Sequence, residues 1–77
     1  MPGIEFAQGI DDLLRVLHLS RLDLIQAVTS YEDWVSDPGR SGAFKIRATV
    51  KDGRRVEVSL LPGYDTLVVV DVKETDQ

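Results

Sequence analysis

The sequence predicts an α+β fold in which two N-terminal helices pack on a three-stranded antiparallel sheet, in the order ααβββ. In the second half of the chain, apolar and polar residues alternate with a period of two, which buries one face of a strand and leaves the other in water. In the first half, apolar residues recur at the three- and four-residue spacing of an amphipathic helix. With 77 residues and no cysteine, the chain is expected to form one small domain without disulfides.

The single domain, residues 1–77, divides into four parts. We expect a helical half over about residues 8–35, a loop over 36–43, an antiparallel sheet over 44–73 and a frayed tail over 74–77. The loop prediction rests on a run of residues that favour turns (Asp-Pro-Gly-Arg-Ser-Gly). We interpret this segment as a loop within one domain and not as an interdomain linker.

The helical half contains the patterns of two helices. The apolar stripe of the first helix consists of Ile10, Leu13, Leu14 and Leu17. Ser20 and Asp23 have the spacing of a capping box, in which a hydroxyl accepts a backbone N–H and a carboxylate reaches back, so a second helix begins there. The joint around His18 is short, and we expect the two helices to meet at a marked angle or as a hairpin.

Three alternating segments and two turn signals predict the sheet. The dipeptide Asp52-Gly53 lies between the first two segments and indicates a hairpin, and Pro62-Gly63 marks the second turn. In the last segment we place Val68, Val70 and Val72 on the core side of the sheet. Leu67 and Val69 are then apolar on the other face, as expected for a central or covered strand.

The net charge of −4 disfavours nonspecific binding to nucleic acids, whose affinity comes mainly from neutralised phosphates. Residues 41–61 nevertheless contain five Lys or Arg and only two Asp or Glu. The alternation predicts that Lys45, Arg47, Arg55 and Glu57 share the polar face of the sheet. Two interpretations follow: solvated ion pairs that contribute little to stability, or cations that converge on a phosphate.

Other candidate residues carry weaker signals. Tyr64, in the second turn, is included among the candidate binding residues, although we expect its ring to pack over the sheet edge. Tyr31 and Trp34 follow the second helix; they form either an exposed interaction surface or, as we expect for Trp34, a plug at one end of the core. The only histidine, His18, is expected to cap, pack or face water. We expect no metal site, no cofactor and no assignable catalytic residue.

Four segments, in this order, resemble the small RelE/BrnT-type toxin-fold proteins and their uncharacterised relatives. The segments are 19–28, the polar loop with Asp37-Pro38 and Gly39-Arg40, 52–58 and 67–72. The resemblance implies two helices followed by an antiparallel sheet whose exposed face carries the RNA-cleaving residues in active toxins. It would place Arg47, Arg55 and Lys45 on that face. The first helix lacks the His-Ala-x-x-Arg-like element of those relatives, and active toxins are generally basic.

We therefore expect a small cytoplasmic binding or regulatory protein without catalytic activity, whose partner is another protein or a second copy of the chain. The alternative is a toxin-like endoribonuclease that holds RNA phosphate on the exposed sheet face. A helix-turn-helix regulator is disfavoured, because the second helix offers only Arg21 and Gln26 beside Asp23 for base contacts. The N-terminus lacks the pattern of a signal peptide, and no apolar run is long enough to cross a bilayer.

Overall fold

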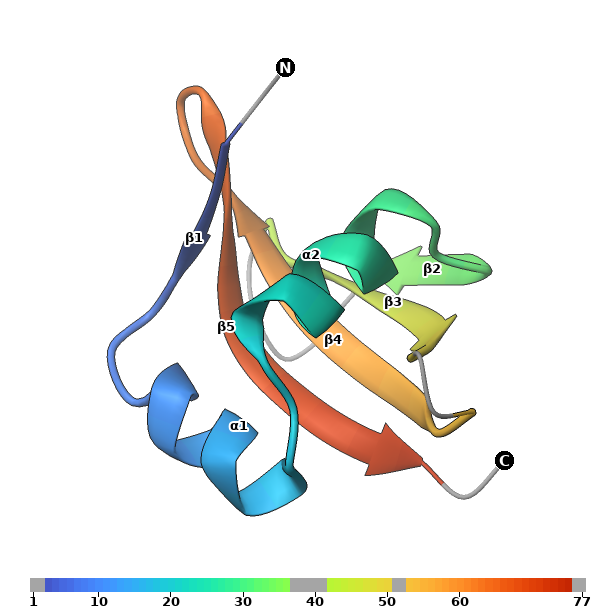
Figure 1. Ribbon diagram of the computed structural model, residues 1–77. Helices are drawn as coiled ribbons and strands as arrows, with labels where there is room; N and C mark the ends of the chain where they lie inside the picture. Colours follow the sequence, from blue (N-terminus) through green and yellow to red (C-terminus); the bar gives the residue numbers. More distant parts are fainter. Residues whose placement is uncertain (1–2, 37–41, 51–52, 76–77) are drawn as a thin grey trace.

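The computed structural model describes residues 3–36, 42–50 and 53–75. The two helices are α1 (Ile10–Leu17) and α2 (Arg21–Thr29). The strands are β1 (Gly3–Phe6), β2 (Asp33–Ser36), β3 (Phe44–Thr49), β4 (Arg55–Pro62) and β5 (Thr66–Thr75). Figure 1 shows their arrangement as one sheet with the helices in front of it. The predicted α+β class is confirmed.

The predicted three-stranded antiparallel sheet is wrong in detail. Within the described ranges the sheet has five strands in the order β1-β5-β4-β3-β2, and β1 runs parallel to β5. Strands β3, β4 and β5 form the antiparallel centre that the alternation predicted. The two added strands lie at the edges and have four residues each, too few for a period of two to stand out.

The predicted helical half, residues 8–35, also ends too late. Helix α2 stops at Thr29, where the hydroxyls of Thr29 and Ser30 both donate to the Gln26 carbonyl oxygen, at 3.0 and 2.7 Å. Side chains that bond the backbone in this way compete with helix continuation. The chain then enters β2, which pairs with β3. Of the predicted loop over 36–43, Ser36 belongs to β2 and residues 37–41 lie outside the described ranges.

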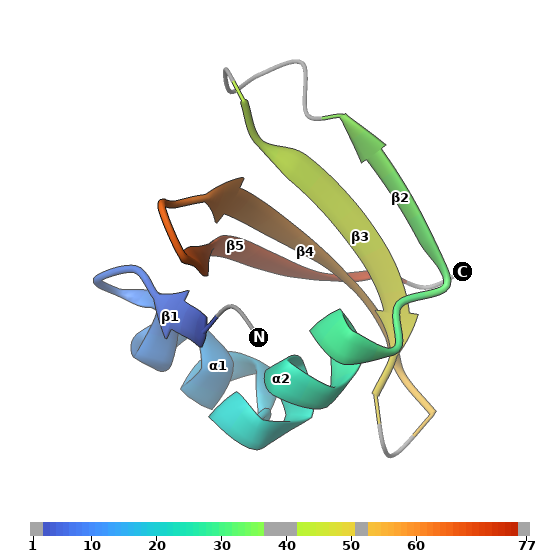
Figure 2. The ribbon, with the colours of Figure 1, turned by 90° about the horizontal axis from the view of Figure 1, so that it is seen from above.

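Both helices lie on the same side of the sheet, and the described segments leave its other side uncovered (Figure 2). The buried hydrophobic core forms between these layers. Its largest fully buried side chains are Leu24, Ile46, Leu60, Val56, Val58 and Val69. Two short helices on one sheet face are the two-layer solution expected for a small α+β domain.

The phase of β5 differs from the prediction because the ladder contains a register shift. Ser59 pairs with Asp71 and the next residue, Leu60, pairs with Val69, so the register skips Val70. An extra residue of this kind reverses which side chains face the core. Val72 is buried as predicted, whereas Val69 is 0% exposed and Val70 only partly buried. Leu67 also packs against the core, so the predicted assignment of Val68 and Val70 to the core side is wrong.

The joint between α1 and α2 is a helix-terminating turn followed by a capping box. His18 adopts a left-handed conformation with φ 57°. Its N–H donates to the Arg15 carbonyl oxygen at 3.2 Å, and the Leu19 N–H donates to that of Leu14 at 2.9 Å. This pair of bonds is a Schellman motif, and both leucines are buried. The exposed His18 therefore caps α1, and the capping box predicted at Ser20 is present.

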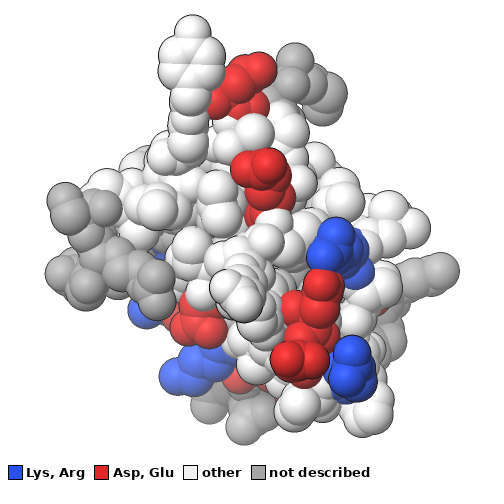
Figure 3. All heavy atoms as spheres, turned by 90° about the vertical axis from the view of Figure 1, so that its left-hand side faces the viewer, with Lys and Arg blue, Asp and Glu red and all other residues white. Residues whose placement is uncertain are grey.

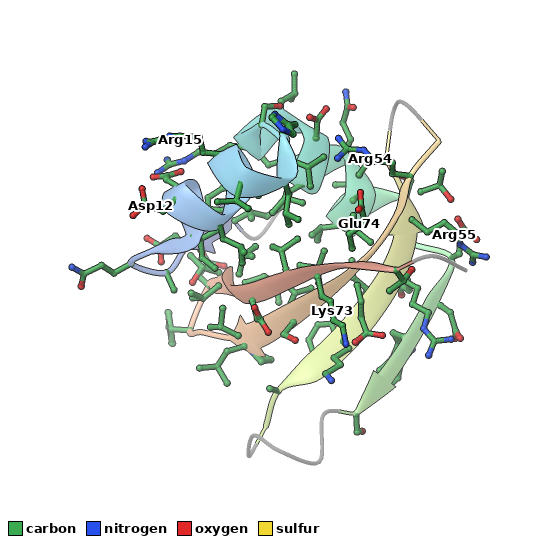
Figure 4. The ribbon with its side chains drawn as sticks, turned by 90° about the horizontal axis from the view of Figure 1, so that it is seen from below. Asp12, Arg15, Arg54, Arg55, Lys73 and Glu74 are labelled. Atoms are coloured by element: carbon green, nitrogen blue, oxygen red, sulfur yellow. The ribbon has the colours of Figure 1, made fainter. Side chains whose placement is uncertain are left out.

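Arg54, just before β4, fastens the β3–β4 turn to the end of α1. Its Nη1 donates to the Leu17 carbonyl oxygen at 2.5 Å, and its Nη2 to that of His18 at 3.1 Å. A cation stabilises the negative end of a helix. Arg54 also pairs with Glu74 at 3.3 Å, and Figure 4 shows these two side chains together on the helix side of the sheet. The predicted frayed tail is wrong here, because β5 continues to Thr75; residues 76–77 lie outside the described ranges.

Both predicted hairpin turns are found where the structure describes them. Gly53 has φ +92°, a backbone conformation that side chains disfavour, and its N–H donates to the Val50 carbonyl oxygen at 2.9 Å. Its predicted partner Asp52 lies outside the described ranges. In the second turn, the Gly63 N–H donates to the Thr66 carbonyl oxygen at 2.7 Å.

The substitution His18→Gly is expected to raise the free energy of unfolding by about 1 kcal/mol, because glycine adopts the left-handed conformation without the penalty paid by a side chain. Denaturant unfolding of both proteins measures the difference. Val16→Gly is the control: Val16 is exposed in the body of α1, where glycine should lower stability. A destabilised His18→Gly protein would mean that the histidine side chain itself holds the turn.

A pH-dependent link joins α1 to α2. Arg21 donates from Nε and Nη2 to the two carboxylate oxygens of Asp11, at 2.8 and 2.6 Å. This hydrogen-bonded pairing lowers the pKa of Asp11. A depressed carboxyl pKa stabilises the fold above the unfolded value and loses that contribution as the pH falls through the folded value.

Asp11→Asn is therefore expected to lower stability near neutral pH, and the difference from the unsubstituted protein should disappear as the pH is lowered from about 5 to about 2. Denaturant unfolding at several pH values provides the measurement. The matched control is Asp12→Asn in the same helical turn, since Asp12 approaches Arg15 only at 3.6 Å. Equal pH dependence in both variants would contradict a specific role of the Asp11–Arg21 pair.

Candidate functional site

The uncovered sheet face carries the charged residues that the alternation predicted. In the register, Arg47 lies opposite Glu57, and Glu57 lies opposite Lys73 on the next strand. The Glu57 carboxylate forms ion pairs with Lys45 Nζ at 3.6 Å and with Arg47 Nε at 3.5 Å. The Glu57 side chain is only 19% exposed. One carboxylate thus lies between two of the three candidate cations.

The third candidate cation, Arg55, is paired elsewhere. Its Nη2 lies 3.3 Å from Glu32 Oε2, and the other oxygen of that carboxylate accepts the Thr49 hydroxyl at 2.6 Å. Figure 4 shows Lys73 leaving β5 on the side opposite Glu74, away from the helices. The described ranges provide no ion-pair partner for Lys73 within 4.0 Å. The predicted cations are on one face but do not converge on an anion site.

Charges of both signs are also mixed on the side of the molecule that carries β1 and α1. Figure 3 shows Lys and Arg next to Asp and Glu there, with no patch of a single sign. Such a surface gives little steering toward a polyanion.

Tyr64 is separate from these cations. Its side chain is 107% exposed in the β4–β5 turn, so the prediction that its ring packs over the sheet edge is wrong. It lies beyond the end of β4, whereas Glu57 is near the start of that strand. The structure does not bring the five predicted binding residues into one site.

A pocket of about 240 Å³ opens beside the end of α2 and is lined by Tyr31, Trp34 and Phe44. Trp34 pairs with Ile46 across the sheet and so points to the helix-covered face. Its ring meets that of Phe44 at 79°, with centroids 5.9 Å apart. Trp34 is 54% exposed and Tyr31 47% exposed, so the prediction that Trp34 plugs the core is wrong.

The sequence contained part of the signal for this pocket. Tyr31 and Trp34 are close in the chain, and an exposed aromatic pair was one of the two interpretations considered for them. Phe44 joins them only because β2 pairs with β3 and places Ser36 opposite it. No residue pattern predicted that pairing.

No group of three or more His, Cys, Asp or Glu residues in the described part of the chain is placed to hold a metal ion. None of the described helices has the length and apolar character needed to cross a membrane. A scan against protein-family models gives no match, and neither do comparisons with curated proteins and with solved structures.

Replacing both face carboxylates, Glu57→Gln with Glu32→Gln, is expected to tighten binding of single-stranded RNA about fivefold at low salt and to steepen its salt dependence, because the cations lose their internal partners. Fluorescence anisotropy of a labelled RNA measures both effects. The control, Asp12→Asn with Asp65→Asn, changes the net charge equally away from this face. Equal gains in the two double variants would show that net charge alone matters.

Proposed function

We propose that this chain is a small non-catalytic binding protein of RelE/BrnT-like architecture that holds a partner protein at its aromatic pocket. The observation that carries the proposal is the exposure of Trp34 and Tyr31 around an open pocket. Trp and Tyr are over-represented among the residues that dominate protein–protein affinity. Three of the five aromatic residues of the chain line this one pocket.

The scaffold part of the proposal is supported by the element order. Two consecutive helices, α1 and α2, precede the antiparallel run β2 to β5, and the sheet face opposite the helices is uncovered. The absence of catalysis is supported by the pairing of Lys45 and Arg47 with Glu57 and of Arg55 with Glu32. A cytoplasmic location accords with a cysteine-free chain, which needs no oxidising compartment.

The test is site-specific crosslinking in cells of the source organism. A benzophenone amino acid replaces Tyr31 in one protein and Tyr64, the fully exposed aromatic residue of the β4–β5 turn, in the other. We expect a defined adduct, identified by mass spectrometry, from position 31 only. An adduct of two copies of the chain would identify the partner as the protein itself. Adducts from both positions, or from neither, would contradict the proposal.

A toxin-like endoribonuclease is the second candidate, favoured by the uncovered position of Lys45, Arg47 and Arg55 on adjacent strands. It is less well supported, because the carboxylates of Glu57 and Glu32 neutralise these cations where RNA phosphate would lie. Induction in a bacterial host tests it. Growth arrest that disappears with Arg47→Ala plus Arg55→Ala would support it, and growth without arrest would exclude it in this form.

A further inference from the structure

We propose that the outer edge of β1 binds a strand of a partner protein that carries a lysine or arginine between two apolar residues. This edge is a second interaction surface, independent of the aromatic pocket. The sheet order β1-β5-β4-β3-β2 places β1 and the pocket strand β2 at opposite edges. Figure 1 shows β1 as the outermost strand, with no described strand or helix beyond it.

The backbone of β1 has hydrogen-bonding groups that face away from the sheet. The N–H groups of Gly3 and Ala7 both donate to carbonyl oxygens in or next to β5, at 3.2 and 2.9 Å. Successive residues of an outer strand face its neighbour and solvent in turn, so the N–H and C=O groups of Ile4 and Phe6 point outward. Neither residue makes a backbone hydrogen bond outside the ladder in the described ranges. Such a row of open groups is a template for a further strand.

The opposite edge of the sheet is closed at the corresponding position. Arg47 of β3 turns its carbonyl oxygen toward β2, where it accepts the Glu32 N–H at 2.8 Å. Asp33 pairs with Arg47, so the backbone of Asp33 faces β3 and that of Trp34 faces outward. The outward Trp34 N–H already donates to Asp33 Oδ1, at 2.9 Å. An added strand would have to displace this carboxylate at β2, whereas the outward groups of β1 have no such cap in the described part of the chain.

Glu5 gives the edge of β1 a negative charge without a partner. Its side chain is exposed and lies on the sheet face away from the helices, since Ile4 and Phe6 pack against the core. Its cross-strand neighbour on β5 is the apolar Val68. Among the described residues, no Lys or Arg forms an ion pair with its carboxylate. The open cross-strand position beside Glu5 is therefore on the outer side, where an added strand would lie.

This charge decides against a second copy of the chain. In an antiparallel dimer of two β1 strands, the register that bonds both outward residues pairs Ile4 with Phe6 of the second copy. That register places the two Glu5 side chains directly opposite each other on one face of the sheet. Like charges in this position destabilise a strand pair, whereas opposite charges stabilise it. The edge therefore disfavours its own sequence and selects a strand with Lys or Arg opposite Glu5.

The residues that flank this cation are apolar for a separate reason. Opposite Ile4 and Phe6, their side chains would lie on the helix side of the sheet, where Ile4 and Phe6 are only partly buried. Apolar side chains there would extend the core beyond β1.

The test uses three blocked peptides, Thr-Val-Lys-Val-Thr and its forms with a central Gln or Glu, which read the same in both directions. An NMR titration follows the backbone amides of Ile4 and Phe6. We expect the lysine peptide to shift both amides and to bind about fivefold more tightly than the glutamine peptide, with the glutamate peptide weakest. The preference should shrink as salt is raised. Equal binding of the three, or shifts at other residues only, would overturn the proposal.

An N-methylated peptide separates strand addition from simple charge attraction. Methyl groups on both valine nitrogens remove the donors that would bond to β1 but leave the lysine unchanged, so this peptide should lose binding. Binding of the unmethylated lysine peptide should also slow the exchange of the Ile4 and Phe6 amides with solvent. Retained binding of the methylated peptide would reject the strand geometry.

Matched variants test the role of the carboxylate. Glu5→Lys should reverse the order, so that the glutamate peptide binds most tightly. Asp12→Lys, on α1, changes the net charge equally and should leave the order as it was. A Glu5→Lys protein with the original order would overturn the assignment to β1.

The oligomeric state of the unsubstituted protein provides the last check. Sedimentation as a dimer with protected Ile4 and Phe6 amides would identify a second copy as the occupant and overturn this choice. Crosslinking at position 31 concerns only the pocket at the other edge of the sheet, so each of the two proposals can fail without the other.

Discussion

The structure depends on how much of one sheet face two short helices can cover. Helices of eight and nine residues are about 12 to 14 Å long, whereas five strands about 4.8 Å apart span roughly 19 Å between the outer strands. Helix α1 packs on β5 and α2 on β3. The outer strand β2 therefore extends past the helical layer, and its inward-facing Trp34 meets solvent instead of a helix.

This geometry explains why the prediction that Trp34 plugs the core is wrong. A large aromatic residue after an amphipathic helix is usually a core residue. Trp34 does lie on the sheet face that the helices cover, and it would be buried there if the helical layer extended further. Phe44 lies at the edge of the core. It packs partly against the buried core and partly forms the wall of the pocket, so the core ends within the width of one side chain.

The sequence predicted those features whose cause is local. The capping box of Ser20 and Asp23 depends on four consecutive residues, and the strands β3 and β4 on an uninterrupted alternation. It missed β1 and β2 because strands of four residues form only by pairing with distant segments, which no local pattern records. The phase of β5 failed because of one residue: the register skips Val70, so the side chains of residues 67–69 face opposite to the predicted alternation, which holds at Val72.

The same distinction holds for the two candidate surfaces. The period-two alternation was enough to predict that four charged residues share one sheet face: Lys45, Arg47, Arg55 and Glu57. In the structure, the hairpin register places Glu57 beside Arg47. The Glu32 carboxylate that pairs with Arg55 was not predictable, because it depends on β2. The pocket depends on β2 as well, since that strand alone joins Trp34 to Phe44.

The proposed binding role of this pocket can be tested separately from the stability of the fold. Tyr31 and Trp34 are each about half exposed and contribute little to the core, whereas Phe44 contributes to both. A loss of binding after substitution of Phe44 would not distinguish a damaged pocket from a loosened core. Tyr31 follows the end of α2 and precedes β2, so its ring can be removed while the capping hydrogen bonds to Gln26 and the pairing of β2 remain. A change in partner binding at constant stability is therefore attributable to the ring itself.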